Sequence, residues 1–178
     1  MTLLDAPQFQ ALFDQARATV FRLEGHQTYA VASDDEELAA FRTGAPRPER
    51  SVRTSPWLAR IAVSTATGGV SWSRVRVIEY PLTEYTRYEL VAYVESQAAG
   101  EQILITESPA PVDDFWLLDG GTEYAVGVWM RYADDGTQLG RELETNPAEL
   151  EKMAAVATQV TRTAAPLNVW LAGASDTA

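Results

Sequence analysis

The sequence predicts one α/β or α+β domain, built on a mixed β-sheet with flanking helices. The chain has 178 residues, the size of a single domain, and 46% of them are hydrophobic, so it can bury a core. A strand pattern at 70–78, a helical pattern and a second strand pattern at 102–106 follow one another, which is the order of a β-α-β crossover. The turn residues Asp134-Asp135-Gly136 add a β-hairpin.

Residues 1–69 are predicted to be mainly helical, with short strands. Asp5 and Gln8 have the spacing of a capping box, and apolar residues recur after them at helical spacing. Short strands are expected at 19–23 and at 29–32.

Two more helices are expected in this first part of the chain. One begins at the capping-box pair Ser33 and Glu36 and ends at Gly44. The other begins at Ser55, directly ahead of a proline, and ends at Gly69. The stretch between these helices contains proline and several arginines, and it is expected to be a loop.

Residues 70–172 are predicted to form the α/β core of the same domain. Within them, the segment 83–97 alternates passably as a strand, but it also suits a helix between Thr83 and Gly100. We prefer the helix, because it completes a crossover between two parallel strands.

Strands are then expected at 115–118, 124–132 and 138–143, and the hairpin turn joins the last two. A helix begins after Asn146 and buries a stripe of five residues: Leu150, Met153, Ala154, Ala157 and Val160. Residues 173–178 are expected to be a flexible tail.

The composition excludes several classes of protein. There is no cysteine, so disulfides, thiolate metal sites and a cysteine nucleophile are excluded. The start of the sequence shows no signal-peptide pattern, and no run approaches the roughly 18 apolar residues of a membrane span. We therefore expect a cytoplasmic protein without membrane contact. The net charge of −11 argues against direct nucleic-acid binding, which needs clustered cations.

The charge is uneven along the chain. Residues 1–90 hold ten Arg and eleven acidic residues, whereas residues 91–178 hold four basic and fourteen acidic residues. A basic-leaning surface can therefore exist locally in the first half. Five arginines on and around one loop are usually just solvated, yet they could contact a partner protein: Arg42, Arg47, Arg50, Arg53 and Arg60.

No catalytic set is recognisable in the sequence. His26 is the only histidine, and it lies beside a glycine without an evident partner for acid–base chemistry. There is no G-x-S-x-G elbow and no glycine-rich loop of the phosphate-binding or dinucleotide-binding kind. The only lysine, Lys152, falls within the expected final helix. We therefore expect no catalytic residues, no metal site and no cofactor.

Carboxylates are the remaining option for chemistry. Asp113, Asp114 and Asp119 bracket an apolar run that is expected to be a strand. Acidic residues at a strand end can bind a cation or act as an acid–base pair. The alternative, which we favour, is that they solvate and cap the ends of a buried strand.

Two arginines and a tryptophan share one face of the expected strand at 70–78, because successive side chains of a strand alternate. These guanidiniums could bind an anion, or they could pair with a nearby internal acid, since half-buried arginines are costly without a partner. The candidate ligand-binding residues are Trp72, Arg74, Arg76, Tyr85, Glu101, Asp114, Trp116 and Asp119.

Seven segments, spread over nearly the whole chain, carry a resemblance to known proteins: 9–17, 21–24, 73–79, 81–89, 99–101, 114–119 and 140–147. The most distinctive is Asp-Phe-Trp-Leu-Leu-Asp at 114–119. These segments resemble a family of uncharacterised actinobacterial proteins that are often encoded beside helix-turn-helix regulators. The resemblance implies a bacterial cytosolic setting and a regulatory neighbourhood, and it supplies no catalytic residues.

The expected order of elements is also similar to half of a phospholipase D-like domain. Enzymes of that superfamily need a His-x-Lys-x-x-x-x-Asp motif, whereas His26 and Lys152 are far apart in this sequence. The resemblance therefore implies the fold without the activity.

Three functions are compatible with these patterns. The first is a non-enzymatic regulatory or sensing module that binds a partner protein, linked to a helix-turn-helix transcription regulator. The alternative is a domain that binds a small anion, and a carboxylate-dependent hydrolase comes third. A flat apolar patch would favour the first, and a pocket with converging arginine and aromatic side chains would favour the second. Two carboxylates about 5–9 Å apart in a cleft would favour the third.

Overall fold

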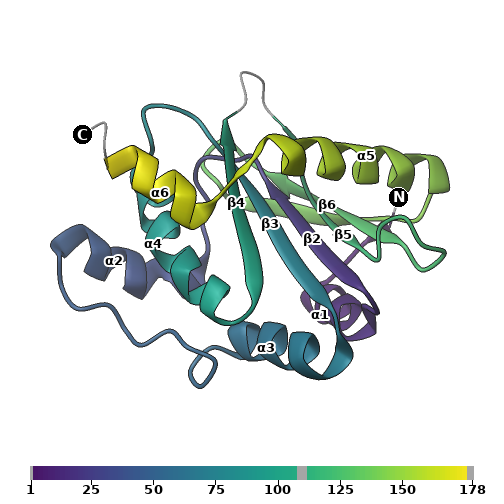
Figure 1. Ribbon diagram of the computed structural model, residues 1–178, viewed down its shortest axis with the longest axis horizontal. Coiled ribbons are helices and arrows are strands. Elements are labelled where there is room, and N and C mark those ends of the chain that lie inside the picture. The colour runs from purple at the N-terminus through teal and green to yellow at the C-terminus, as the bar shows by residue number, and fades with distance from the viewer. Residues whose placement is uncertain (1, 108–111, 176–178) are drawn as a thin grey trace.

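The computed structural model describes residues 2–107 and 112–175, and within them it confirms the mixed α/β fold (Figure 1). The strands are β1 (Thr2–Leu3), β2 (Thr19–Glu24), β3 (Ser71–Ile78), β4 (Glu101–Glu107), β5 (Asp114–Leu118), β6 (Val126–Tyr132), β7 (Gln138–Glu144) and β8 (Ala165–Pro166). The helices are α1 (Ala6–Gln15), α2 (Asp35–Thr43), α3 (Pro56–Gly68), α4 (Glu84–Ala98), α5 (Pro147–Thr163) and α6 (Leu167–Ser175).

All eight strands form one sheet, in the order β1-β7-β6-β5-β2-β3-β4-β8. Strands β2, β3 and β4 run parallel to one another, and the remaining neighbours pair antiparallel. The central strand β2 comes from residues 1–69, so the two parts expected from the sequence share this sheet.

The crossover predicted from the sequence is confirmed. Segment 83–97 is helical and joins the parallel strands β3 and β4. The hydroxyl of Thr83 accepts a hydrogen bond from the backbone N–H of Thr86 at 3.0 Å, which caps the first turn of α4. Gly100, with a φ of 109°, reverses the chain into β4, a conformation that favours glycine.

The predicted hairpin and the predicted final cap are confirmed as well. Strands β6 and β7 pair antiparallel across the turn at Asp134-Asp135-Gly136. The Asn146 side chain accepts from the N–H of Ala148 at 2.9 Å and starts α5. The predicted stripe of α5 packs on the sheet, with Met153 and Ala157 buried.

The two faces of the sheet have different characters, because side chains alternate along each strand. One face is apolar and lies under α5, where Leu23, Val75 and Phe115 form part of a buried cluster with Met153. The other face is covered by α1, α3 and α4. It is apolar beside α1 and α3 but carries buried charges beside α4. In Figure 1, α5 lies along the top of the sheet and α1 and α3 lie at its lower end.

Two sequence expectations for the first part of the chain are wrong. Residues 29–32 do not form a strand, because β3 and β5 already occupy both edges of β2. The segment instead runs as a loop against the hairpin turn, where the N–H of Ala30 donates to the carbonyl of Gly136 at 3.0 Å. The next helix begins at Asp35, after a 3₁₀ turn at Ala32–Asp34, and not at Ser33.

The C-terminal segment also differs from the expectation of a tail. Residues Gly173 to Ser175 belong to α6, whose buried Leu167 packs with Ile105 of β4 and Leu90 of α4. The rest of the expected tail, 176–178, lies outside the described residues. Within the described part of the chain, none of the helices has the length and apolar character needed to cross a membrane. The similarity to a phospholipase D-like half-domain stays a prediction.

Candidate ligand-binding site

Three buried charged residues, Arg22, Glu24 and Arg76, and the largely buried Arg74 face α4 from the centre of the sheet. In the parallel pairing of β2 with β3, Arg22 lies opposite Arg74 and Glu24 lies opposite Arg76. Arg22 and Arg76 are 2% and 0% exposed. Two guanidiniums directly opposite each other repel, so this arrangement needs carboxylates between them.

Glu24 supplies the central carboxylate. Its Oε1 accepts from Nη1 of Arg74 at 2.6 Å and from Nε of Arg22 at 3.3 Å, and its Oε2 accepts from the hydroxyl of Tyr93 at 2.6 Å. Burial would raise the pKa of Glu24, but the guanidiniums of Arg74, Arg22 and Arg76 outweigh burial and lower it to about 2. Glu24 is therefore ionised at neutral pH and binds β2 to β3 and α4.

Asp114, on β5, is the second carboxylate partner of Arg22. It accepts from Nη2 of Arg22 at 2.7 Å and from the hydroxyl of Tyr29 at 2.6 Å. It also accepts from the backbone N–H groups of Gly25 and His26, at 2.8 and 3.1 Å. Asp114 thus anchors the loop that follows β2, as well as pairing with a buried charge.

Arg76 connects the sheet to α4. Its Nη2 donates to the hydroxyl of Thr86 at 3.2 Å, and its Nη1 donates to the carbonyl of His26. Nη2 also lies 3.0 Å from Oε2 of Glu89, but the two atoms are oriented as an ion pair and not as a hydrogen bond. Burial outweighs the attraction of Arg76 and raises the pKa of Glu89 to about 8.

The raised pKa of Glu89 leads to a prediction about pH. The folded protein holds this proton up to about pH 8, whereas the unfolded chain releases it near 4.5, so the free energy of unfolding should fall as pH rises between these values. Glu89→Gln cannot release the proton. We therefore expect the melting temperature of the variant to fall less than that of the wild type between pH 5 and pH 8.5. Parallel curves for the two proteins would contradict the raised pKa.

Glu101, at the start of β4, completes the charged cluster. Its Oε1 accepts from Nε of Arg74 at 3.0 Å. The side chain is buried, and burial raises the pKa of this carboxyl in spite of Arg74. Of the alternatives that the sequence left open for the arginines of β3, the geometry shows pairing with internal acids, Arg74 with Glu101 and Arg76 with Glu89.

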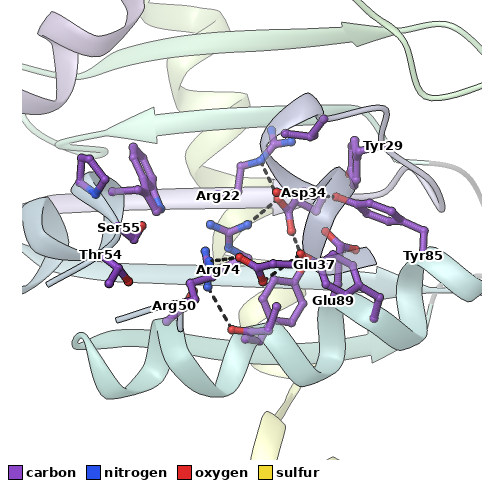
Figure 2. A pocket seen from close by; sticks show the side chains of 18 of the residues that line it. Arg22, Tyr29, Asp34, Glu37, Arg50, Thr54, Ser55, Arg74, Tyr85 and Glu89 are labelled. Atoms are coloured by element: carbon purple, nitrogen blue, oxygen red, sulfur yellow. Dashed lines mark hydrogen bonds and ion pairs between the residues drawn. The ribbon is translucent and has the colours of Figure 1, made fainter. Parts of the chain in front are cut away.

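Beside this cluster lies a cavity of about 530 Å³, lined by Arg22 and Glu24 at the end of β2 and by Arg74 in the middle of β3. The volume suits a small molecule. Figure 2 shows Arg22 and Arg74 entering the same space as Tyr85 and Glu89. The aromatic side chains that line the cavity are Tyr29, Trp57, Tyr85, Tyr88, Tyr93 and Tyr132.

The outer part of the cavity is formed by α2 and the loop that follows it. Glu37 of α2 accepts from the hydroxyl of Tyr88 at 3.3 Å, while Arg50 of the loop donates to the carbonyl of Ala92 at 3.2 Å. Arg47 and Arg50 both pair with Glu95, at 3.0 and 3.3 Å. The segment that borders the cavity is therefore fixed to α4 by polar contacts, and α2 itself buries no residue.

Among the described residues that line the cavity, two buried side-chain atoms have no hydrogen-bond partner: Nη1 of Arg22 and Oε2 of Glu89, the latter ion-paired with Arg76. Nε of Arg76 and Oε2 of Glu101, in the charged cluster behind the cavity, have none either. Arg22 is 2% exposed and Glu89 is 7% exposed. Nearly all buried polar groups in native proteins have a partner, so these atoms require an explanation.

The structure brings together most of the candidate residues, in different roles. Arg74 and Tyr85 line the cavity, whereas Arg76, Glu101 and Asp114 lie behind it in the charged cluster. Trp116 lies beneath the two lining arginines, with its ring centre 5.3 Å from the Arg22 guanidinium and 5.8 Å from that of Arg74. Trp72 packs in the apolar cluster under α1 and α3, and its Nε1 donates to Ser64 at 2.7 Å.

Asp119 lies apart from the cavity, at the opposite end of β5. Its carboxylate accepts from the backbone N–H groups of Arg17, Ala18 and Thr19, at distances of 2.7–3.1 Å. It therefore shapes the turn into β2, the capping role that the sequence favoured for these acids. In the described ranges no three acidic or histidine side chains are grouped so that they could hold a metal ion.

The arginines of the α2–α3 region are paired inside the chain. Arg42 contacts Glu84 at 2.6 Å, Arg53 contacts Glu49 at 3.1 Å, and Arg60 contacts Asp14 at 3.2 Å. Together with the Arg47 and Arg50 pairs, these contacts give each of the five arginines an ion pair within the chain, while the Arg42 and Arg53 side chains stay exposed. Contact of these arginines with a partner protein stays a prediction.

His26 contributes to this region through its backbone. Its ring stacks on Tyr132 with ring centres 5.7 Å apart and does not line the cavity. We expect His26→Ala to keep ligand binding unchanged, because the carbonyl and N–H that bond Arg76 and Asp114 remain. Isothermal titration of the variant with any ligand of the wild type checks this. A folded His26→Ala protein that no longer binds would assign the ring a direct role.

Sequence reasoning missed Arg22, Glu24 and Glu89, which hold the centre of the site. A signal for the first two existed, because Arg22 and Glu24 alternate on one strand just as Arg74 and Arg76 do. A parallel strand buried on both faces is normally apolar throughout, so charges at alternate positions indicate a polar site. Glu89 gave no comparable signal, since a single acid on a helix is ordinary.

The chain matches the family model described as a domain of unknown function (DUF6879) over residues 7–172, and it therefore belongs to this family. No curated protein matches the chain.

Proposed function

We propose that this domain binds a small organic anion in the cavity bordered by β2, β3 and α4. The observation that carries the proposal is the unpartnered Nη1 of Arg22, a buried cationic donor at the wall of a cavity of about 530 Å³. An anionic group on a ligand would satisfy this donor. A charge-assisted hydrogen bond of this kind is worth roughly 1.5–3 kcal/mol.

The lining supports a ligand that is partly apolar. Tyrosine and tryptophan rings form much of the wall, so an aromatic or aliphatic body could pack beside the anionic group. The guanidinium of Arg22 is also held rigidly by Glu24 and Asp114, so it loses little freedom when a ligand binds. Of the functions open to the sequence, this geometry favours the anion-binding domain.

The test compares Arg22→Lys with the wild type, using a panel of carboxylic acids and inorganic phosphate as probes. A lysine ammonium can still pair with Asp114, but it leaves no second nitrogen for the ligand. We expect at least one organic acid to raise the melting temperature of the wild type and to bind about ten-fold or more weakly to Arg22→Lys. Arg162→Lys, on the exposed side of α5, is the matched control.

A second measurement does not depend on the stability of the Arg22 variant. Trp57 lines the cavity and Trp116 lies beneath Arg22, so a bound ligand should change the tryptophan fluorescence of the wild type, and Trp57→Phe should reduce that change. Equal affinity of Arg22→Lys and wild type, or binding that leaves Trp57 unaffected, would place the ligand elsewhere and overturn the proposal.

The link to a helix-turn-helix regulator in an actinobacterial cytosol stays a prediction from the resemblance. Ligand binding would give such a regulatory module its signal, so the two ideas are compatible. The domain would then respond to a small molecule and pass the response to a partner protein.

A further inference from the structure

Arg74 offers the cavity a second donor beside the one at Arg22. It donates to Glu101 through Nε and to Glu24 through Nη1, whereas its Nη2 donates to none of the described residues. Its side chain is 11% exposed, and it lines the same cavity as Arg22. A ligand in this cavity can therefore meet two guanidinium groups instead of one (Figure 2).

The two guanidiniums are held close together. Arg22 and Arg74 lie at paired positions of the neighbouring strands β2 and β3, and both donate to the same oxygen of Glu24, at 3.3 and 2.6 Å. Both also lie over the ring of Trp116. These contacts fix the two guanidiniums before a ligand arrives, so a group that pairs with both loses little free energy to ordering of the protein.

We infer that the ligand is a monocarboxylic acid whose carboxylate binds both guanidiniums, with one oxygen on Arg22 and the other on Arg74. This inference rests on the proposed function, because it assumes that the cavity is the binding site. A carboxylate has two oxygens in one plane, and each can accept a charge-assisted hydrogen bond, which matches two fixed donors on neighbouring strands. Arg74 is then a second ligand-binding residue.

The charges around the two arginines favour one negative charge on the ligand over two. Arg22 already pairs with Glu24 and Asp114, and Arg74 pairs with Glu24 and Glu101. The two guanidiniums are therefore largely neutralised within the chain. The second charge of a phosphate dianion would lie among buried carboxylates and would gain no further cation in return.

The rest of the cavity wall indicates that the other end of the ligand is uncharged. The outer part of the wall contributes three carboxyl groups and one guanidinium: Asp34, Glu37, Glu49 and Arg50. A second carboxylate on the ligand would meet these acids and be repelled. Glu89, from α4, is already paired with Arg76 at 3.0 Å. The aromatic side chains of the wall instead offer contact to an apolar body.

The experiment uses the full chain and matched probes of similar size that differ in charge. One set contains 3-phenylpropionate, its neutral amide, phenylsuccinate and 2-phenylethyl phosphate, and a second contains hexanoate, hexanamide, adipate and pentyl phosphate. Isothermal titration at pH 7 measures the affinity of each probe for the wild type, Arg22→Lys and Arg74→Lys. Arg131→Lys is the matched control, because Arg131 lies on a strand, pairs with Glu142 at 2.9 Å and does not line the cavity.

We expect at least one monocarboxylate to bind the wild type about ten-fold or more tightly than its amide, its dicarboxylate and its phosphate ester. Arg22→Lys and Arg74→Lys should each reduce the preference for the acid over the amide to about two-fold, since each leaves one carboxylate oxygen without a donor. This ratio does not change with a general loss of stability, so it separates a ligand contact from a supporting role. If Arg74→Lys does not fold, Arg74→Gln, which can still donate to Glu101, takes its place.

The outcomes separate this inference from the proposed function. If the dicarboxylates or phosphate esters bind as tightly as the monocarboxylates, the single charge is wrong and the anion site stands. If Arg74→Lys keeps the preference for the acid while Arg22→Lys loses it, the shared carboxylate is wrong and the anion site again stands. If no acid binds, if the amides bind as tightly as the acids, or if Arg22→Lys binds like the wild type, both the inference and the proposed function fall.

Discussion

Replacing Glu24 with alanine should lower the free energy of unfolding by about 3–5 kcal/mol, because it leaves two buried guanidiniums without their shared partner. Glu24 pairs with Arg74 at 2.6 Å and with Arg22 at 3.3 Å, and it also accepts from Tyr93. Alanine offers no acceptor to any of these three donors.

Urea-induced unfolding followed by far-UV circular dichroism measures this loss. Glu24→Gln is the informative companion, because it keeps the acceptor for Tyr93 and removes only the charge, so it should cost less than alanine. Glu49→Gln is the control, since its pair with Arg53 is exposed and exposed pairs contribute little. If Glu24→Ala unfolds at the same urea concentration as the control, the buried cluster does not stabilise the fold.

The difference in stability between the wild type and the Glu24 variants should depend on pH in the acid range. The folded pKa of Glu24 is about 2, below its ordinary value of 4.5, so its contribution is present above pH 4.5 and is lost as pH falls towards 2. This is the opposite sign to Glu89, whose effect lies between 4.5 and about 8. The two carboxylates of one cluster can therefore be separated by the pH range in which each acts.

The sequence predicted those parts of the fold that local chemistry decides. The Asp5–Gln8 capping box, the Asn146 cap and the Asp134-Asp135-Gly136 turn all depend on residues within three or four positions of one another. The crossover around 83–97 also followed from local order, since Thr83 and Gly100 mark its ends.

The errors arose where distant partners decide the structure. Residues 29–32 have strand-like composition, but whether they join the sheet depends on β3 and β5 having taken both edges of β2. Likewise α6 is a helix that packs Leu167 against the sheet, and nothing near the end of the sequence indicates that surface. A sequence pattern indicates which element a segment can form, whereas its place in the sheet depends on which other strands pair with it.

The candidate site was likewise predicted only where a local sequence pattern decides the structure. The alternation of β3 correctly placed Arg74 and Arg76 on the face opposite Val75 and Val77. The cavity itself needed α4 and the loop after α2 to come together, and contacts such as Arg50 with Ala92 join residues 42 positions apart. The spacing of residues along the chain could not predict that these two segments meet to form the cavity.

Buried ion clusters of this kind are weak evidence for stability, because removing charges from water costs about as much as pairing returns. A core of apolar residues at the positions of Arg22, Glu24, Arg74 and Arg76 could stabilise the sheet equally well. This supports the proposal that the cluster holds the donor at Arg22 in a fixed position for a ligand.

Arg76→Ala should be as destabilising as Glu24→Ala, at about 3–5 kcal/mol, and should leave ligand affinity unchanged. Arg76 is fully buried but does not line the cavity, so it acts behind the site. Its removal leaves a void and deprives the His26 carbonyl, Thr86 and Glu89 of their partner. Arg76→Met fills most of the volume, so it should lose less stability and give a folded protein for binding measurements.

Melting temperature and probe affinity, measured on the same samples, decide between a structural and a binding role for this arginine. A folded Arg76→Met protein that binds like the wild type, together with a low melting temperature for Arg76→Ala, supports the structural role. Loss of binding in folded Arg76→Met would make Arg76 part of the ligand contact. The double variant Arg74→Ala/Arg76→Ala tests both guanidiniums together. Losing two buried charged partners should cost stability. If this variant melts and binds like the wild type, neither guanidinium contributes and this face of the sheet is solvated.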